Sequence, residues 1–335
     1  LGGVLFTSFV NNKFDSDPKR WRIVAALSVD CAMYLEALTP LVPVLFLPLA
    51  ALANMCKSIS WLAASATRAG IHLSFANKGN LADITKKAGP QGVVASTAGN
   101  FLGIFMSPFV GSDPYNILGC VFVLSTVHLS TMIYALKYVS LNTLNMQRGE
   151  IFTRHYLTLG SANSKRSTNP ILTPEMVAKE EIVIGNGLRH LFHGFKSKLM
   201  IGPPVEDIYN EMMAQNKGNR FDAMLTDLKM HKFAVFDFNN SRKDKEKTNM
   251  VGLYFDDDAT TKDMLKGYLI SMHYINSLET SFGDNSVKHD KQLLVHSYLY
   301  GDKMIDDYIV TLENNGWNAE HVFFDEKNMG RLTFL

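Results

Sequence analysis

The chain has 335 residues, enough for two domains, and carries 33 Lys and Arg against 32 Asp and Glu, for a net charge of +1. A near-neutral total without a dense basic block argues against nucleic acid as the main partner. The charge is unevenly spread, because 18 charged side chains lie in residues 1–150 and 47 in residues 151–335. We therefore expect two unlike halves, an apolar helical half followed by a charged half.

Three cysteines, Cys31, Cys56 and Cys120, lie in apolar surroundings. An odd count without paired or metal-like spacing predicts no disulfide framework and favours a reducing compartment. We expect each of them to act as a small buried hydrophobe. Because the chain begins with Leu1 and not with Met, we also expect it to lack the start of a longer protein, including any targeting peptide.

Two segments open the apolar half. Residues Trp21 to Leu38 read as an amphipathic helix, in which Asp30 and Glu36 would need partners if they sat in hydrocarbon. Residues Ala37 to Cys56 carry no charge, but three prolines interrupt them, at positions 40, 43 and 48. Because proline breaks or kinks a helix, this stretch is predicted to be a broken span or a re-entrant segment.

The next two segments, Val93 to Val110 and Ile117 to Leu136, contain no charged residue and reach the length of a membrane span. The short loop between them lacks Lys and Arg, whereas the outer flanks are basic, with Lys86 and Lys87 before and Lys137 after. The pattern predicts a hairpin whose basic ends face the cytoplasm or stroma. Gly99 and Gly103 would allow close helix approach. A buried or peripheral helical domain is the alternative.

The charged half begins after a polar connector at residues 160–169. Thr173 and Pro174 indicate a helix start, and Phe233 to Phe238 and Met250 to Phe255 read as a strand pair joined by the charged linker 241–249. Two helices and two closing strands are predicted after it, at Thr260 to Ser277, Lys303 to Asn314, His321 to Phe324 and Arg331 to Leu335. The fold class is therefore α+β: an N-terminal all-α domain of apolar, membrane-embedded helices (1–150), a helical connector region (151–230) and a small α+β domain (231–335).

The densest polar signal of the first half runs from Lys57 to Gln91. At helical spacing Lys57, Trp61, Arg68 and His72 share one face. Such a cationic stripe could bind an anionic head group, a phosphate or a carboxylate. The alternative is that these cations reach an interface or pair with the acids of the first helix, at positions 30 and 36.

The same segment continues after Gly79, where Asn80 is predicted to cap a short helix with Asp83 in its first turn. Asp83 and Lys87 are spaced i,i+4, and Gly89-Pro90 is predicted to end the helix. Local structure explains most of this pattern. Asn80, Asp83, Lys87 and Gln91 are nevertheless kept as ligand candidates together with Lys57, Arg68 and His72.

This segment resembles the Root UVB Sensitive family, the proteins that share the DUF647 domain. The residues that carry the resemblance are Phe46-Leu47-Pro48-Leu49-Ala50, Lys57-Ser58-Ile59-Ser60-Trp61, Ala66-Thr67-Arg68-Ala69, Ser74-Phe75-Ala76, Asn80-Leu81-x-Asp83-Ile84-Thr85-x-Lys87 and Gln91. It returns near the end at Asp257-Asp258-Ala259-Thr260 and Gly316-Trp317. The resemblance implies predicted membrane helices and, in plant relatives, a connection with development, UV-B response and vitamin B6 homeostasis, often in plastids. It brings no established catalytic residue.

Three functions are compatible with these observations. The leading hypothesis is a non-enzymatic scaffold or adaptor in an organelle membrane, in a plastid or another endomembrane, with its C-terminal domain on the reducing side and a protein partner or family paralogue bound to it. The second is a carrier of an anionic solute that uses the Lys57/Arg68/His72 face. The third is an enzyme or vitamin B6-handling protein. No catalytic residue, metal site or cofactor is predicted.

Overall fold

The computed structural model describes residues 13–76, 79–161, 171–184, 198–203, 218–237, 250–280, 287–324 and 331–332. The chain divides into two compact units, Leu1–Leu141 with Ile182–Gly194, and Asn142–Glu181 with Phe195–Leu335. One unit is all-α and the other α+β, which confirms the predicted fold class. The domain boundaries predicted at residues 150 and 230 stay predictions. The connector 162–169 and the linker 241–249 lie outside the described residues.

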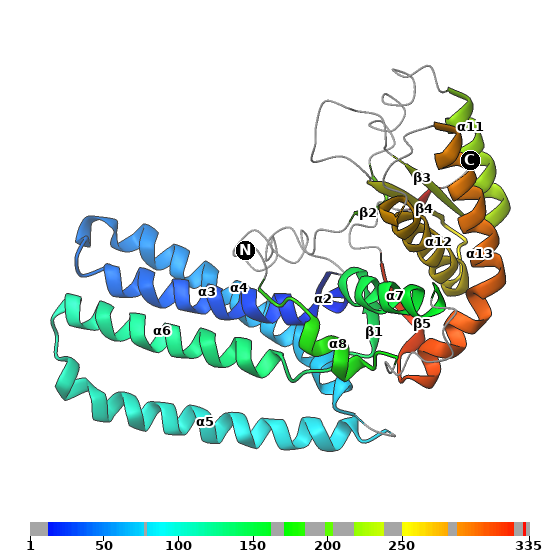
Figure 1. Ribbon diagram of the computed structural model, residues 1–335. Helices are drawn as coiled ribbons and strands as arrows, with labels where there is room; N and C mark the ends of the chain where they lie inside the picture. The colour runs from blue at the N-terminus through cyan, green and yellow to red at the C-terminus, as the bar shows by residue number, and fades with distance from the viewer. Residues whose placement is uncertain are drawn as a thin grey trace. The chain divides into compact units, whose positions relative to one another are not determined.

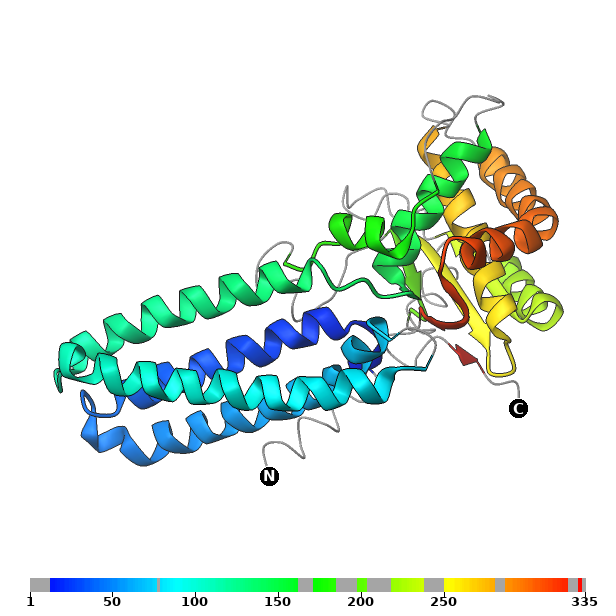
Figure 2. The same ribbon diagram turned by 90° about the horizontal axis from the view of Figure 1, so that it is seen from below.

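Long helices make up the first unit. They are α2 (Lys13–Ser16), α3 (Pro18–Leu38), α4 (Phe46–Ser74), α5 (Leu81–Val110) and α6 (Pro114–Leu136), with the 3₁₀ turn η1 (Pro43–Leu45) before α4. Figures 1 and 2 show α3, α4, α5 and α6 running lengthwise beside one another, each reversing the direction of the helix before it. The starts of α3 and α5 and the ends of α4 and α6 therefore lie at the same end of the unit.

Two of these helices start with the same N-terminal cap, an aspartate followed by a proline. Asp17 precedes Pro18, and its carboxylate accepts the backbone N–H of Arg20 at 3.2 Å. Asp113 precedes Pro114 and accepts the N–H of Asn116, also at 3.2 Å. The side chain satisfies a backbone donor that has no helical partner, while the proline presets the first helical φ. The sequence therefore fixes where α3 and α6 begin.

The proline-rich stretch Ala37 to Cys56 contains one break in the helices, between Leu38 and Pro43. Pro40 and Pro43 occupy the corner between α3 and α4, whereas Pro48 lies in the first turn of α4. A backbone N–H in the first turn has no helical acceptor, so a proline there removes no hydrogen bond. The stretch is therefore a sharp corner followed by the start of a continuous 29-residue helix.

Gly89-Pro90 does not end α5, the helix that begins at Leu81. The helix continues through Pro90 and Pro108 to Val110 and ends where Gly111 takes a positive φ of 70°. An interior proline removes one backbone hydrogen bond, and long apolar helices tolerate that loss. The predicted short helix and the predicted span Val93 to Val110 are therefore parts of one 30-residue element.

The α3–α4 contact rests on small side chains. Only Ala53, Ala63 and Thr67 of α4 are buried. Cys56 and Ser60 fall between them, so the steps along this face are 3, 4, 3 and 4 residues. A face of Ala, Cys, Ser and Thr lets two helix backbones approach closely. The first α-helical hairpin is therefore held by close backbone packing instead of large interlocking side chains.

Among the described residues of this unit, three helices are long and apolar enough to cross a membrane, namely Pro43–Ser74, Leu81–Val110 and Pro114–Leu136. No residue of α5 is buried, and large apolar side chains stand out from the helices, with Phe101 70% and Phe122 63% exposed. Exposed apolar surface of this extent is typical of membrane or protein contact. The predicted spans Val93 to Val110 and Ile117 to Leu136 lie inside two of these helices.

The second unit contains short strands and several helices. They are β1 (Thr143–Asn145), α7 (Met146–Ser161), α8 (Pro174–Glu180), β2 (Leu199–Ile201), α11 (Gly218–His231), β3 (Phe233–Asp237), β4 (Val251–Asp256), α12 (Thr261–Thr280), α13 (Val287–Asn314), β5 (Asn318–Phe323) and β6 (Arg331–Leu332). The larger sheet has the order β2-β4-β3, and β6 also pairs with β4. β3 and β4 are antiparallel with Val235 opposite Leu253, which confirms the predicted strand pair. β1 and β5 form a separate parallel pair.

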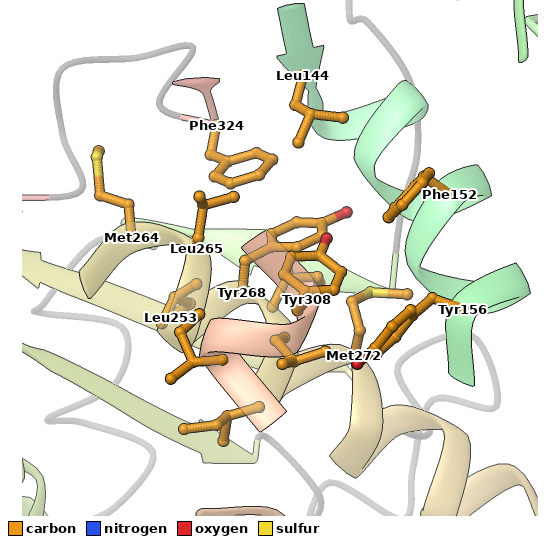
Figure 3. Packing of buried hydrophobic residues seen from close by; sticks show 14 of the residues in the cluster. Leu144, Phe152, Tyr156, Leu253, Met264, Leu265, Tyr268, Met272, Tyr308 and Phe324 are labelled. Atoms are coloured by element: carbon orange, nitrogen blue, oxygen red, sulfur yellow. The ribbon is translucent and has the colours of Figure 1, made fainter. Parts of the chain in front are cut away.

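The core of this unit is aromatic and lies between α12 and its neighbours (Figure 3). Tyr268 of α12 stacks on Phe324 with ring centroids 4.1 Å apart. Tyr308 of α13 is fully buried, and its hydroxyl lies 2.7 Å from the hydroxyl of Thr153 on α7. Because buried hydroxyls carry hydrogen-bond partners, large tyrosines can fill the core without an unsatisfied polar group. The α+β unit therefore has a well-packed core of its own.

Candidate functional site

The polar segment Lys57 to Gln91 forms the second half of α4, the corner after it and the first third of α5. The positions Lys57, Arg68 and His72 lie on one helix, as predicted. Lys57 and His72 are nevertheless 15 residues apart, which is about 22 Å along a helix axis. The predicted stripe is therefore too long to bind one small ligand along its whole length.

Lys57 is engaged by an acid of the preceding helix. Its ammonium donates to the Glu36 carboxylate over 2.5 Å, and both side chains are nearly half exposed. This is one of the two roles that the sequence left open for the cationic face. Exposed pairs of this kind contribute little to stability in water, but the contact neutralises both charges on an apolar helix pair. Lys57 therefore contributes an interhelical contact.

Arg68 and His72 lie near the end of α4. Arg68 is exposed and interacts electrostatically with Arg22 of α3, whose guanidinium donates to the Ala64 carbonyl over 2.8 Å. His72 Nδ1 lies 3.4 Å from the Thr85 hydroxyl of α5. Arg22, Arg68 and His72 therefore all lie toward the end of the unit where α4 leads into α5, and the two like-charged guanidiniums favour an anion beside them.

Asn80 precedes α5, and its backbone carbonyl accepts the N–H groups of Asp83 and Ile84 at 3.0 and 3.2 Å. Its side chain does not cap the helix, so the predicted capping by Asn80 is wrong. Asp83 sits in the first turn, where an acid complements the helix dipole. Asn80 and Asp83 therefore have clear local roles in starting the helix.

The exposed side of α5 forms an open surface groove of about 390 Å³. Its lining residues are Asp83, Lys86, Lys87, Pro90 and Gln91. Three of the predicted ligand candidates are thus brought together, whereas Lys86 and Pro90 were not among them. Because every lining residue comes from α5, the groove is a shallow hollow along one helix. Ligand binding by these residues stays a prediction.

The sequence did not predict a second polar contact, which joins Asp30 of α3 to His128 of α6. Asp30 of α3 is 7% exposed and accepts a hydrogen bond from His128 Nδ1 of α6 over 2.9 Å. The need of Asp30 for a partner could be read from its apolar helix, but the partner lies 98 residues away in the chain. Nothing in a local pattern specifies that pairing. Arg22 was missed for the same reason, since its proximity to Arg68 depends on how α3 and α4 align.

Within the described ranges, no three His, Cys, Asp or Glu side chains come together as a group that could hold a metal ion. Two pairs of ionisable groups join helices of the first unit, Glu36–Lys57 and Asp30–His128. The described part of this unit therefore offers polar pairs between apolar helices, together with a basic end.

Comparison with known proteins finds one family model and several curated relatives of the same kind. Residues 1–160 match the vitamin B6 photo-protection and homoeostasis domain. The chain is 26% identical to root UVB sensitive 3 of Arabidopsis thaliana over 96% of its own length and 67% of that protein. It is 28% identical to the chloroplastic root UVB sensitive 2 of the same plant, over 95% and 66% of the two chains. RUS family member 1 of Dictyostelium discoideum is 25% identical over 65% of this chain and 39% of its own length.

The chain spans about two thirds of the length of the first two plant relatives. No solved structure matches it. The matched domain covers the helical unit with its polar segment, and the plant relatives align across both units. The chain is therefore similar to the Root UVB Sensitive proteins over most of its length.

Proposed function

We propose that this chain is a non-enzymatic membrane anchor and scaffold that acts in vitamin B6 homoeostasis and presents its α+β unit to a protein partner. The observation that carries the proposal is the unburied apolar surface of α5 and α6. In water such a surface would drive aggregation, whereas in a bilayer it is the expected exterior of a spanning helix. The description of the matched domain supplies the connection with vitamin B6.

The charge distribution supports an orientation for the anchor. Arg22, Arg68, Lys86, Lys87 and Lys137 all lie near the end of the helical unit where α6 leads into β1. The opposite end, at the loop between α5 and α6, carries Asp113 and no Lys or Arg. The positive-inside rule places the basic end in the cytoplasm or stroma. The α+β unit then emerges on that reducing side of an organelle membrane, in a plastid or another endomembrane.

Alkaline carbonate extraction tests the anchor. The full chain, expressed in a eukaryotic host, is expected to stay in the membrane pellet. The double variant Phe101→Arg/Phe122→Arg places two charges on the apolar surface and is expected to leave the pellet or to be degraded, since each charge is costly in hydrocarbon. The matched control Lys262→Arg/Lys303→Arg alters only the second unit. Extraction of the unaltered chain into the soluble fraction would overturn the anchor.

A second function is favoured by one specific observation, the position of Arg22, Arg68 and His72 toward the same end of the helical unit. This arrangement suits a carrier or receptor for a small anion such as a phosphate ester. Purified chain in liposomes is then expected to bind or transport such an anion, and Arg68→Gln is expected to weaken the effect at least tenfold. Equal binding by Lys57→Gln and Arg68→Gln would count against a site at the basic end.

A further inference from the structure

The surface groove near the start of α5 lies at the level that lipid head groups would occupy around a membrane anchor. All the residues that line it are exposed, namely Asp83, Lys86, Lys87, Pro90 and Gln91. The rest of the helix, residues 88–110, carries no charge and extends for about 35 Å, slightly more than the hydrocarbon thickness of a bilayer. The two lysines therefore lie just outside the hydrocarbon when α5 spans the membrane.

The groove faces away from the helix that precedes α5. Thr85 marks the side of α5 that faces α4, because its hydroxyl lies 3.4 Å from His72 Nδ1. At 3.6 residues per turn, the residues that line the groove lie on the opposite side of the helix from Thr85. No residue of α5 is buried, so no described element covers this face. The groove is therefore open to whatever surrounds the helical unit.

The same face of α5 continues beyond the groove as a row of large apolar side chains. Val94, Phe101 and Phe105 follow Lys87 by 7, 14 and 18 residues, and each of these spacings returns to the same side of a helix. All three side chains are exposed. Cations that stand at one end of an exposed apolar row complement a phospholipid, whose phosphate pairs with the lysines while an acyl chain lies along the row.

The charge of the groove indicates which kind of phospholipid it suits. Lys86 and Lys87 are positive and Asp83 is negative, so the lining carries a net charge of +1. An anionic phospholipid with one phosphodiester carries one negative charge and matches this lining, whereas a zwitterionic phospholipid carries no net charge. A free phosphate monoester carries nearly two negative charges at neutral pH and matches it less well. The charge balance therefore favours an anionic phospholipid.

We propose that the groove on α5 is a binding site for the head group of an anionic phospholipid such as phosphatidylglycerol. Lys86 and Lys87 donate to the phosphate oxygens, and Asp83 accepts from a head-group hydroxyl. Gln91, one turn closer to the hydrocarbon, donates its amide N–H to an ester carbonyl of the lipid. The site rests on the membrane anchor proposed above and adds to it a preference for one class of lipid.

The test measures which lipids contact α5 directly beyond the groove. Val94→Trp places a fluorescent reporter about 10 Å from Lys87 along the helix, in a full chain in which Trp21 and Trp61 are replaced by Phe. The chain is reconstituted in phosphatidylcholine liposomes that contain the same minor fraction of either brominated phosphatidylglycerol or brominated phosphatidylcholine. Bromine on an acyl chain quenches a tryptophan that it contacts. Salt at about 0.15 M screens exposed charges beyond about 8 Å, which limits attraction by the rest of the chain.

Brominated phosphatidylglycerol is expected to bind at the reporter at least about fivefold more tightly than brominated phosphatidylcholine, because a single lysine near the surface contributes about that factor. Lys86→Gln/Lys87→Gln is expected to remove the preference and to leave quenching by brominated phosphatidylcholine unchanged. The matched control Arg68→Gln/Lys137→Gln removes two charges from the same end of the unit, outside the groove, and is expected to keep the preference.

Four results would overturn the lipid site. Equal quenching by the two brominated lipids would remove it and leave the membrane anchor standing, whereas no quenching by either lipid would overturn the anchor as well. Equal loss of the preference in the double variant and in the control would assign it to the overall charge of the basic end. Displacement of the lipid by an excess of soluble glycerol phosphate would assign the groove to a free phosphate ester. Quenching by brominated phosphatidylcholine shows in each variant that α5 is embedded, so a misfolded variant is recognised.

Discussion

Asp30 and His128, 98 residues apart, form a 2.9 Å hydrogen-bonded pair between α3 and α6, with the Asp30 side chain 9% and the His128 side chain 39% exposed. The carboxylate accepts from the imidazole, so each group satisfies the other within an apolar bundle. Replacement of His128 by Leu leaves the carboxylate without this partner. We expect a loss of about 1–3 kcal/mol, below the cost for a fully buried pair because His128 is partly exposed.

The measurement is the thermal unfolding midpoint of the purified chain in detergent. The double variant Asp30→Asn/His128→Leu removes the carboxylate charge as well and is expected to regain part of the lost stability. A double variant no more stable than His128→Leu alone would show that the pair has no such role.

The second unit contains a buried ion pair with a matched exposed one. Arg148 Nη1 lies 3.0 Å from the Glu181 carboxylate, with the side chains 1% and 3% exposed. Lys262 lies 2.7 Å from Asp306, with the side chains 57% and 80% exposed. Arg148→Met is expected to cost about 3–5 kcal/mol because it removes the guanidinium partner of a buried carboxylate. Lys262→Met is expected to cost less than about 1 kcal/mol.

Urea unfolding, followed by the fluorescence of the buried Trp317 in a chain in which Trp21 and Trp61 are replaced by Phe, measures both losses. Equal shifts of the urea midpoint in the two variants would contradict the burial argument.

His273 of α12 makes the stability of the second unit depend on pH. Burial, together with the nearby His296, lowers the pKa of His273 to about 4 from its ordinary 6.5. Its Nδ1 lies 2.9 Å from the Ser297 hydroxyl, and its ring stacks on Tyr300 at 4.1 Å. The neutral ring therefore stabilises the folded state.

The sign follows from linkage. Above about pH 6.5 His273 is neutral in both states and has no effect on the pH dependence. Between about pH 6.5 and 4 the unfolded chain binds a proton that the folded chain does not, so stability falls as the pH falls. His273→Phe is expected to flatten the unfolding midpoint across this window. An unchanged slope in the variant would assign the pH dependence to other groups.

Gly252 of β4 is required by close packing. A Cβ at this position would lie 2.1 Å from Cζ of Phe236, and both residues are in the buried sheet. Gly252→Ala is therefore expected to destabilise the unit by about 1–3 kcal/mol. Gly92→Ala in α5, where nothing lies within 4 Å of the added atom, is the control and is expected to be neutral or slightly stabilising. Circular dichroism during thermal unfolding distinguishes the two.

The sequence predicted those parts of the fold that depend on local pattern. Charge-free runs predicted long apolar helices where α5 and α6 lie, and strand-like apolar runs predicted β3 and β4. Proline was harder to interpret, because its effect depends on its position in a turn. Pro48 falls in a first turn and is harmless, whereas Pro90 lies inside a helix and is tolerated there. Local rules alone did not separate these cases.

The candidate site was only partly predictable. Helical spacing placed Lys57, Arg68 and His72 on one helix, and the pairing of a cation with Glu36 was among the stated alternatives. The contacts with Arg22 and Thr85, and the Asp30–His128 pair, depend on the alignment of separate helices. A single sequence contains no local signal for that alignment.

The most direct test of the central claim asks which medium surrounds the apolar helices. A spin label is attached to single cysteines at positions 101, 122 and 87 in a chain without its three native cysteines, reconstituted in liposomes. Relaxation by oxygen, which dissolves in lipid, is compared with relaxation by a water-soluble nickel chelate. The labels at positions 101 and 122 are expected to be reached mainly by oxygen, and the label at position 87 by the chelate. Access of the chelate to all three positions would contradict a membrane-spanning bundle.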